Sequence, residues 1–324
     1  MRARSFGILA MTAFLATAPA AAATDADFNN WLDGFRSEAA AKGISAATIE
    51  AALTGLEPIP RVIELDRKQP ERTVTFDDYI GRILSPTRIA TGRAKLVEHR
   101  AILEEVAQRF GVQPRFIVAL WGIETSYGGY TGSFSVIGAL ATLAWEGRRA
   151  DYFRGELLAA LKIVDQGHVR PASMMGSWAG AMGHSQFMPS SFLAYAIDWN
   201  GDGAKDIWGT HADVFASAAN YLKSVGWNND LTWGREVKLP AGFDAADADL
   251  KVAKTLTEWQ KRGVRRADGG DLPERDLSAS IVLPGGAGGP AFLVYDNYRA
   301  IMRWNRSLYF ATAVGLLSDR IGAP

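Results

Sequence analysis

Residues 114 to 129 read PRFIVALWGIETSYGG. Proline is favoured in the first turn of a helix, the apolar run at 116–123 predicts a buried helix, and the glycine pair ends it. One carboxylate, Glu124, directly follows the apolar run. Burial would penalise its charged form and raise its pKa from a reference value of about 4.3. Such an acid can donate a proton near neutral pH, although a helix cap or a structural ion pair would also explain a glutamate here.

A second unusual stretch is GSWAGAMGHSQFMPSSF, residues 176–192. It is rich in glycine and poor in charge, and it has neither the alternation of a strand nor the spacing of an exposed helix. Its glycines allow the backbone to approach a ligand, and Ser177, His184, Ser185 and Gln186 supply neutral hydrogen-bonding groups. We interpret it as the wall of a binding site. A helix packed tightly through its small residues is the alternative.

The rest of the chain favours helices, followed by short strands. Helices are expected twice within 25–54 and over 85–111, 114–129, 135–146, 149–166, 190–197, 212–225 and 296–321, and a loop is expected at 58–72. After Gly226, the runs REVKL, SIVL and AFLVY are typical of short strands between turn-rich segments. The predicted class is mainly α (α+β). The predicted divisions are 1–23, a helical part at 24–112, a core at 113–228, a small β-containing sub-domain at 229–295, and helices at 296–324 that rejoin the body.

The N-terminus resembles an export signal. Arg2 and Arg4 precede an apolar stretch and three alanines that end at Ala23, which predicts a signal peptide at 1–23 and a soluble periplasmic protein. The 324 residues include no cysteine, so neither disulfides nor a lipid-attachment cysteine is expected. Beyond residue 23 the chain has 33 basic and 35 acidic residues, a balance that argues against nucleic acid as a partner. No stretch reaches the roughly 20 apolar residues of a membrane span.

Several motifs together resemble the lytic murein transglycosylases of the B type. These motifs are GIETSYG, ALATLAWEGRRADYF at 139–153, the 176–192 stretch and DWNGDG. The resemblance implies a lysozyme-like catalytic core flanked by a helical part and a small β part. It also implies cleavage of the bond between N-acetylmuramic acid and N-acetylglucosamine in peptidoglycan, without water and with a 1,6-anhydro end. Peptidoglycan glycan strands would be the partner, together with cell-wall synthesis or remodelling proteins, and no cofactor would be required.

The resemblance implies that Glu124 acts alone. Ordinary glycosidases need two carboxylates about 5 to 9.5 Å apart. Here the 2-acetamido group of the substrate would assist, and Glu124 would act first as acid and then as base. It remains open whether another acid folds back into the cleft; the candidates are Asp151, Glu146 and Glu156. A lysozyme-type hydrolase and a catalytically inactive peptidoglycan-binding protein are the alternative functions.

The resemblance also implies the substrate contacts, at the positions of this chain that match the family's motifs. They are Ser177, Gln186, Tyr221, Trp304 and Asn305. The family more often has tyrosine where this chain has Trp304, so stacking on a sugar face is expected to persist while a hydroxyl hydrogen bond is not. Arg148 and Arg149 face substrate carboxylates or form a solvated helix start, and the second interpretation is preferred.

DWNGDGAKD, residues 198–206, predicts a turn with a possible structural calcium site. Asp198, Asn200, Asp202 and a later Asp213 are the candidate ligands, and Gly203 stands where an EF-hand loop turns sharply. Gly209 replaces the usual bidentate glutamate, and an ordinary Asx-turn loop explains the motif equally well. A calcium-sensing adaptor would rest on this loop alone. The histidines, His99, His168, His184 and His211, lack zinc-ligand spacing and are expected to be structural.

Overall fold

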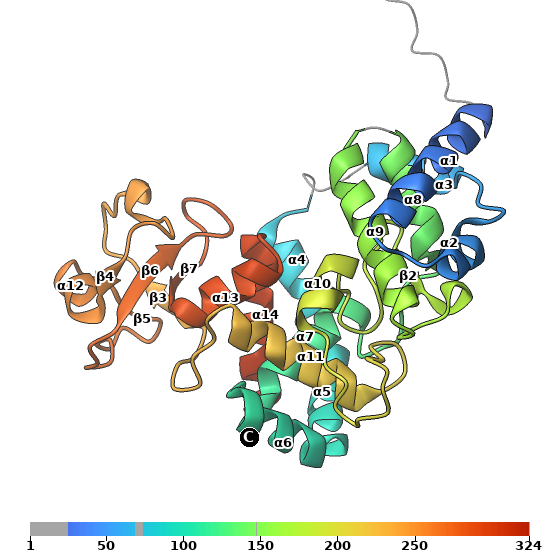
Figure 1. Ribbon diagram of the computed structural model, residues 1–324. Helices are drawn as coiled ribbons and strands as arrows, with labels where there is room; N and C mark the ends of the chain where they lie inside the picture. The colour runs from blue at the N-terminus through green and yellow to red at the C-terminus, as the bar shows by residue number, and fades with distance from the viewer. Residues whose placement is uncertain (1–24, 69–73, 147, 324) are drawn as a thin grey trace, which may run out of the picture.

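The computed structural model describes residues 25–68, 74–146 and 148–323, so the predicted signal peptide lies outside the described residues (Figure 1). Helices dominate, which confirms the predicted class. They are α1 (Asp25–Ala41), α2 (Ala46–Leu53), α3 (Pro60–Arg67), α4 (Phe76–Ile83), α5 (Pro86–Glu98), α6 (Arg100–Phe110), α7 (Pro114–Thr125), α8 (Val136–Glu146), α9 (Ala150–Asp165), α10 (Pro189–Tyr195), α11 (His211–Ser224), α12 (Leu256–Lys261), α13 (Asp296–Trp304) and α14 (Leu308–Gly322).

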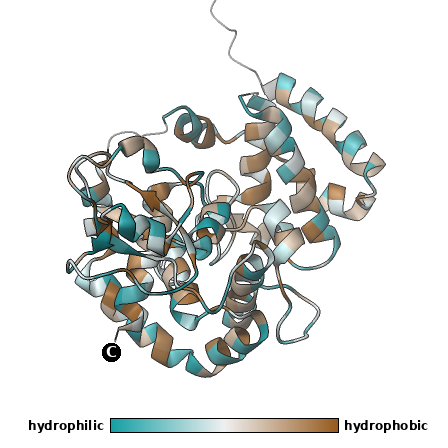
Figure 2. Ribbon diagram, turned by 90° about the vertical axis from the view of Figure 1, so that its left-hand side faces the viewer, coloured by the Kyte–Doolittle hydropathy of each residue, from teal (hydrophilic) through white to brown (hydrophobic). Residues whose placement is uncertain are grey.

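Helix α7 is the centre of the helical body. Its residues from Phe116 to Gly122 are buried, and it packs against α5, α6, α11 and α14. A helix that is apolar on all sides needs such a complete cover. Around it, the surface helices carry polar and apolar residues on different sides (Figure 2). The carboxyl end of α7 is therefore held on several sides, which fixes the position of Glu124.

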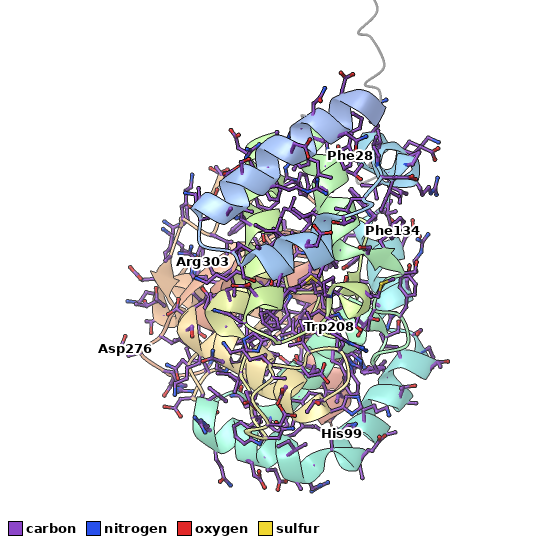
Figure 3. The ribbon with its side chains drawn as sticks, turned by 45° about the vertical axis from the view of Figure 1, so that its right-hand side comes forward. Phe28, His99, Phe134, Trp208, Asp276 and Arg303 are labelled. Carbon is purple, nitrogen blue, oxygen red and sulfur yellow. The ribbon has the colours of Figure 1, made fainter. Side chains whose placement is uncertain are left out.

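A second helical lobe consists of α1, α2, α3, α8 and α9 (Figure 1). Its interior includes an aromatic group in which the Phe28 ring lies 5.3 Å from that of Trp145 and 5.7 Å from that of Trp31. Phe28 belongs to α1 and is 1% exposed (Figure 3). Apolar packing of this kind holds the helices of the lobe together without disulfides.

The predicted β-like runs form one antiparallel sheet in the order β4-β6-β7-β3-β5 at the side of the helical body (Figure 1). Its strands are β3 (Gly234–Lys238), β4 (Lys254–Thr255), β5 (Arg265–Arg266), β6 (Ser278–Val282) and β7 (Ala291–Val294). The sheet packs with α12 around a separate apolar cluster that includes Trp259 and Ile281. Trp233 joins it to the helical body, because its Nε1 donates to Asp319 on α14 at 2.9 Å and Gly315 leaves room for its ring.

Several helical expectations were wrong or incomplete. The segment predicted as a loop at 58–72 contains α3, because Pro60 takes the first helical position, where its missing N–H is harmless. The helix predicted over 85–111 is broken at His99, whose backbone has φ −104° and ψ 17° and whose ring packs against Trp121. The short helices α4 and α12 were not predicted. The helix predicted over 114–129 ends at Thr125, because Ser126 takes a left-handed backbone, and the one predicted over 296–321 is interrupted between α13 and α14. No helix in the described ranges is both long and apolar enough to cross a membrane.

Candidate active site

Glu124 stands in the last turn of α7 and is only partly exposed. The indole Nε1 of Trp304, at the end of α13, donates a hydrogen bond to Glu124 Oε1 at 2.8 Å. The chain then turns away, since Ser126 and Tyr127 both have positive φ, at 51° and 61°. The Tyr127 ring occupies the space in which a side chain at position 122 would lie, which explains why glycine stands there. This turn leaves the carboxyl group at the end of the helix.

Burial raises the pKa of Glu124 to about 7, and the hydrogen bond from Trp304 opposes this rise. Among the described residues, no second acid contributes to this pKa. The Tyr79 phenol on α4 lies close enough to respond to Glu124: burial first, and then the charge of Glu124, raise the pKa of Tyr79, while Arg88 lowers it. At neutral pH the Glu124 carboxyl is therefore poised between its protonated and charged forms.

The three other acids that the sequence left open have different surroundings. Glu146 pairs with Arg67 at 2.9 Å. Glu156 accepts hydrogen bonds from the backbone N–H and the hydroxyl of Ser190, at 2.9 and 2.7 Å, and so caps the start of α10. Asp151 is exposed in the first turn of α9. None of them contributes to the pKa of Glu124, so this geometry gives Glu124 no carboxylate partner.

The 176–192 stretch is a folded loop and not a helix before α10, so the alternative of a helix packed through small residues was wrong. Strand β2 (Met175–Gly176) pairs with β1 (Phe134–Ser135), and Ser177 closes the following turn by accepting from the Ala181 backbone N–H at 3.0 Å. The Gln186 side chain donates to the carbonyl of Thr131 at 3.1 Å, and its own backbone has φ 47°.

Close backbone contacts explain the glycines of this wall. A Cβ at Gly132 would lie 2.0 Å from the Gly176 carbonyl oxygen, and one at Gly176 would lie 2.2 Å from that of Ala181. Both distances are far inside van der Waals contact. The loop therefore forms a rigid surface on which neutral polar groups are fixed.

Aromatic side chains gather beside Glu124. The Tyr221 ring lies 4.9 Å from that of Trp304 and 5.8 Å from that of Phe187, and its hydroxyl donates to the Arg303 carbonyl at 2.7 Å. Figure 3 labels Arg303. The sequence led us to expect that Trp304, which has no hydroxyl group, would not make a tyrosine's hydrogen bond. Its indole N–H donates a hydrogen bond to Glu124 instead.

The other candidate contacts have partners of their own within the protein. Asn305 is exposed, and its side-chain oxygen accepts from the Ser307 backbone N–H at 3.0 Å, just before α14. Arg148 pairs with the buried Asp66 at 2.5 Å, and Arg149 lies over the Tyr152 ring, 4.6 Å from its centroid. Arg148 is therefore occupied within the protein, which argues against the possibility that it faces substrate carboxylates.

Sequence reasoning missed one neighbour of the site. Tyr79 belongs to a helix that was not predicted, and an aromatic residue on an amphipathic segment carries no distinctive signal. His184 belongs to the wall and was also expected to be structural; its Nδ1 accepts a hydrogen bond from Trp121 Nε1 at 2.9 Å, and its ring stacks on that of Trp121. Burial, and then the charge of His211, lower the pKa of His184. It is a packed, neutral imidazole behind the site.

The acidic loop at 198–206 uses its oxygens on its own backbone. Asp198 accepts from the N–H groups of Gly201 and Gly203 at 2.7 and 2.9 Å, and Asp202 accepts from Ala204 at 2.9 Å and from the Asn200 side chain at 2.9 Å. These are Asx-turn contacts.

Asp213, on α11, is fully buried and accepts from the N–H groups of Trp199 and Asp206, both at 2.8 Å. Across the described ranges, no group of three or more acidic or histidine side chains is arranged to hold a metal. Asx turns therefore account for the loop as it stands, and calcium binding by Asp198, Asn200, Asp202 and Asp213 stays a prediction.

Comparison with known proteins places this geometry in a family. Residues 27–319 match the family described as transglycosylase SLT domain. The chain is 32% identical over 250 residues to membrane-bound lytic murein transglycosylase B of Escherichia coli (strain K12), an alignment that covers 75% of this chain and 66% of that protein. The chain thus spans slightly less than two thirds of this relative's length.

Solved structures agree with this assignment. SltB3 from Pseudomonas aeruginosa, in complex with NAG-anhNAM-pentapeptide, superposes with a TM-score of 0.88 at 49% identity, covering 91% of this chain and 79% of that chain. The Escherichia coli lytic transglycosylase Slt35, in complex with calcium, gives a TM-score of 0.76 at 27% identity, covering 92% and 93%. The chain therefore belongs to the lytic murein transglycosylases of the B type, a family of enzymes with the transglycosylase SLT domain.

Proposed function

We propose that this protein is an exported periplasmic lytic transglycosylase that cleaves the β-1,4 bond between N-acetylmuramic acid and N-acetylglucosamine in peptidoglycan. The bond is broken without water, and the product carries a 1,6-anhydro-muramic end. One observation carries the proposal, namely a single desolvated carboxyl group, Glu124, with a pKa of about 7 and no acidic partner among the described residues. The complex of SltB3 with NAG-anhNAM-pentapeptide supports it, since that ligand has such an end.

The proposed reaction has two proton transfers at one group. Protonated Glu124 gives its proton to the leaving glycosidic oxygen as the bond to the muramic C1 breaks. The substrate's 2-acetamido carbonyl stabilises the cation that develops at C1, as in substrate-assisted enzymes. The Glu124 carboxylate then removes the proton of the muramic C6 hydroxyl while O6 bonds to C1. Glu124 ends the cycle protonated, so neither water nor a metal takes part.

Trp304 suits this dual role. Its N–H donor at 2.8 Å stabilises the carboxylate that exists between the two steps, and burial stabilises the acid that exists before and after them. These two opposing influences leave the pKa near neutrality, where an acid that must also serve as a base works best.

In this proposal the glycan strand lies along the wall loop and the aromatic cluster. Ser177 and Gln186 would meet the sugar's polar groups, and Tyr221, Trp304 and Asn305 would line the opposite side. The catalytic core at 113–228 would carry the chemistry, with the parts at 24–112 and 229–295 flanking it. Calcium would have no catalytic role, and any cell-wall partner proteins would act outside this site.

The substitution Glu124→Gln tests the proposal and separates it from a catalytically inactive peptidoglycan-binding protein. It keeps the shape of the side chain and an acceptor for Trp304 but removes the proton. We expect turnover of purified sacculi to be lost while sedimentation with sacculi is retained. An unchanged rate would remove Glu124 from the mechanism, and a wild-type protein that binds without turnover would support the inactive alternative. Reducing ends among the products, read by mass spectrometry, would favour the lysozyme-type hydrolase.

A further inference from the structure

A small, partly open cavity lies beside Glu124, between α7 and α11. Its volume is about 10 Å³, which is the room needed by the centre of a single water molecule. Most of its lining is apolar and comes from the two helices, including Ala218 on α11. His184, Ser185 and Trp304 close it from the wall loop and from α13, and Glu124 forms its remaining side.

Among the described residues that line this cavity, Ser185 alone has a buried side-chain polar atom without a hydrogen-bond partner. The Trp304 N–H donates a hydrogen bond to Glu124, and Nδ1 of His184 accepts one from Trp121. Ser185 is only 3% exposed, and its hydroxyl oxygen has no hydrogen-bond partner among the described residues. An unsatisfied buried hydroxyl costs free energy, so such a group normally has an ordered water as its partner. The buried serine and the carboxyl group supply the two polar contacts that a single water needs.

We propose that Ser185 is a positioning residue, which holds one water in this cavity and through it donates a hydrogen bond to the rear of the Glu124 carboxyl group. The inference rests on the proposed function, since it concerns the same acid. Trp304 would fix the carboxyl group from α13 and the water would fix it from behind. The carboxylate formed between the two proton transfers then has two donors and stays aimed at the sugar.

The other titratable groups near Glu124 do not duplicate this contact. Tyr79 on α4 interacts with the Glu124 charge through space, and Arg88 on α5 acts on Tyr79. His184 is held by Trp121. The cavity lining contributed by α11 has no ionisable side chain. Loss of the water would therefore remove a donor from the charged form and deepen its desolvation, and both effects raise the pKa of Glu124.

Two chemically different variants test this inference. Ser185→Ala removes the hydroxyl, and Ala218→Val fills the cavity while the serine remains. For both we expect the pKa of Glu124 to rise by about one, a tenfold change in its ionisation constant. The pKa is read without substrate, as the infrared carboxyl band of each variant minus that of its Glu124→Gln derivative. Ser318→Ala, which removes a buried hydroxyl that donates to the Gly315 carbonyl on α14, is the matched control and leaves the pKa unchanged.

An unchanged pKa in both variants would overturn the inference, and so would a high-resolution crystal structure of the wild-type protein with no water between Ser185 and Glu124. A rise in Ser185→Ala alone would overturn the water bridge, since the hydroxyl would then act by direct contact. A failure of the proposed function would give a different result. Glu124→Gln would then keep its turnover, whatever the effect of Ser185→Ala. A Ser185→Ala protein that does not fold leaves the decision to Ala218→Val and the crystal structure.

Discussion

Glu124→Gln should stabilise the folded protein, and the size of the gain should depend on pH. The pKa of Glu124 is about 7 in the folded protein and 4.5 ordinarily. Its folded-state pKa is raised, so the stability that this group contributes is fully present below pH 4.5 and is lost as the pH rises through about 7. Each pKa unit corresponds to about 1.36 kcal/mol, so the ionised group costs the folded state about 3 kcal/mol above pH 7.

Glutamine keeps an acceptor oxygen for the Trp304 N–H but cannot ionise. Urea denaturation at pH 4 and pH 8 gives the free energy of unfolding of both proteins. We expect little difference at pH 4 and a variant that is more stable by about 3 kcal/mol at pH 8. Such a gain is a large part of the roughly 5 to 15 kcal/mol that stabilises a typical domain. The denaturant dependence should be unchanged, because the two proteins expose the same surface on unfolding.

Glu105→Gln on α6 is the matched control, since it removes a carboxylate from an exposed position. A stability difference for Glu124→Gln that is the same at both pH values would refute the desolvated-acid reasoning. A variant that is less stable than the wild type at pH 8 would do so as well, because it would mean that the folded protein favours the charged form.

Three other changes test other parts of the account. Trp304→Phe removes the donor to Glu124. In the wild type kcat/KM is expected to fall near pH 7, and Trp304→Phe should raise the pH of this fall by about one pH unit, with a smaller rise in Trp304→Tyr. An unchanged pH profile in Trp304→Phe would contradict the donor's role. Gly132→Ala should destabilise the protein by at least about 2 kcal/mol in thermal unfolding, since its Cβ has no room and its φ is 101°, whereas Gly155→Ala meets no atom within 4 Å and should be neutral or better. Chelation by EDTA should leave turnover unchanged, because the oxygens at 198–206 serve their own backbone; a loss that calcium restores would contradict this.

The fold could be predicted where local signals coincide. Pro114 and the apolar run define the start and the body of α7, although the helix ends at Thr125, before the predicted glycine pair, and the three β-like runs became neighbouring strands of one sheet. The break at His99 could not be predicted, because nothing in the local sequence interrupts the helical pattern. It depends on tertiary packing of the imidazole against Trp121 and His211.

The site was predictable as a set of candidates but not as a geometry. Glu124 stood out because an acid at the end of an apolar helix is unusual. Its hydrogen bond with Trp304 joins residues 180 positions apart, which no local pattern reveals. The fixed orientation of Gln186 likewise depends on the Thr131 carbonyl from another segment. The acidic loop shows the limit of spacing alone, since the same oxygens that suggest a metal site also make Asx-turn contacts with their own backbone.

The central claim is that a single carboxyl group transfers a proton twice and that water never attacks the sugar. Digestion of purified sacculi in water enriched in heavy oxygen tests it directly, with mass spectrometry of the released muropeptides. The account predicts anhydro-muramic ends that contain no heavy oxygen and are lighter than reducing ends by one water molecule. Reducing ends that carry the heavy isotope would contradict it.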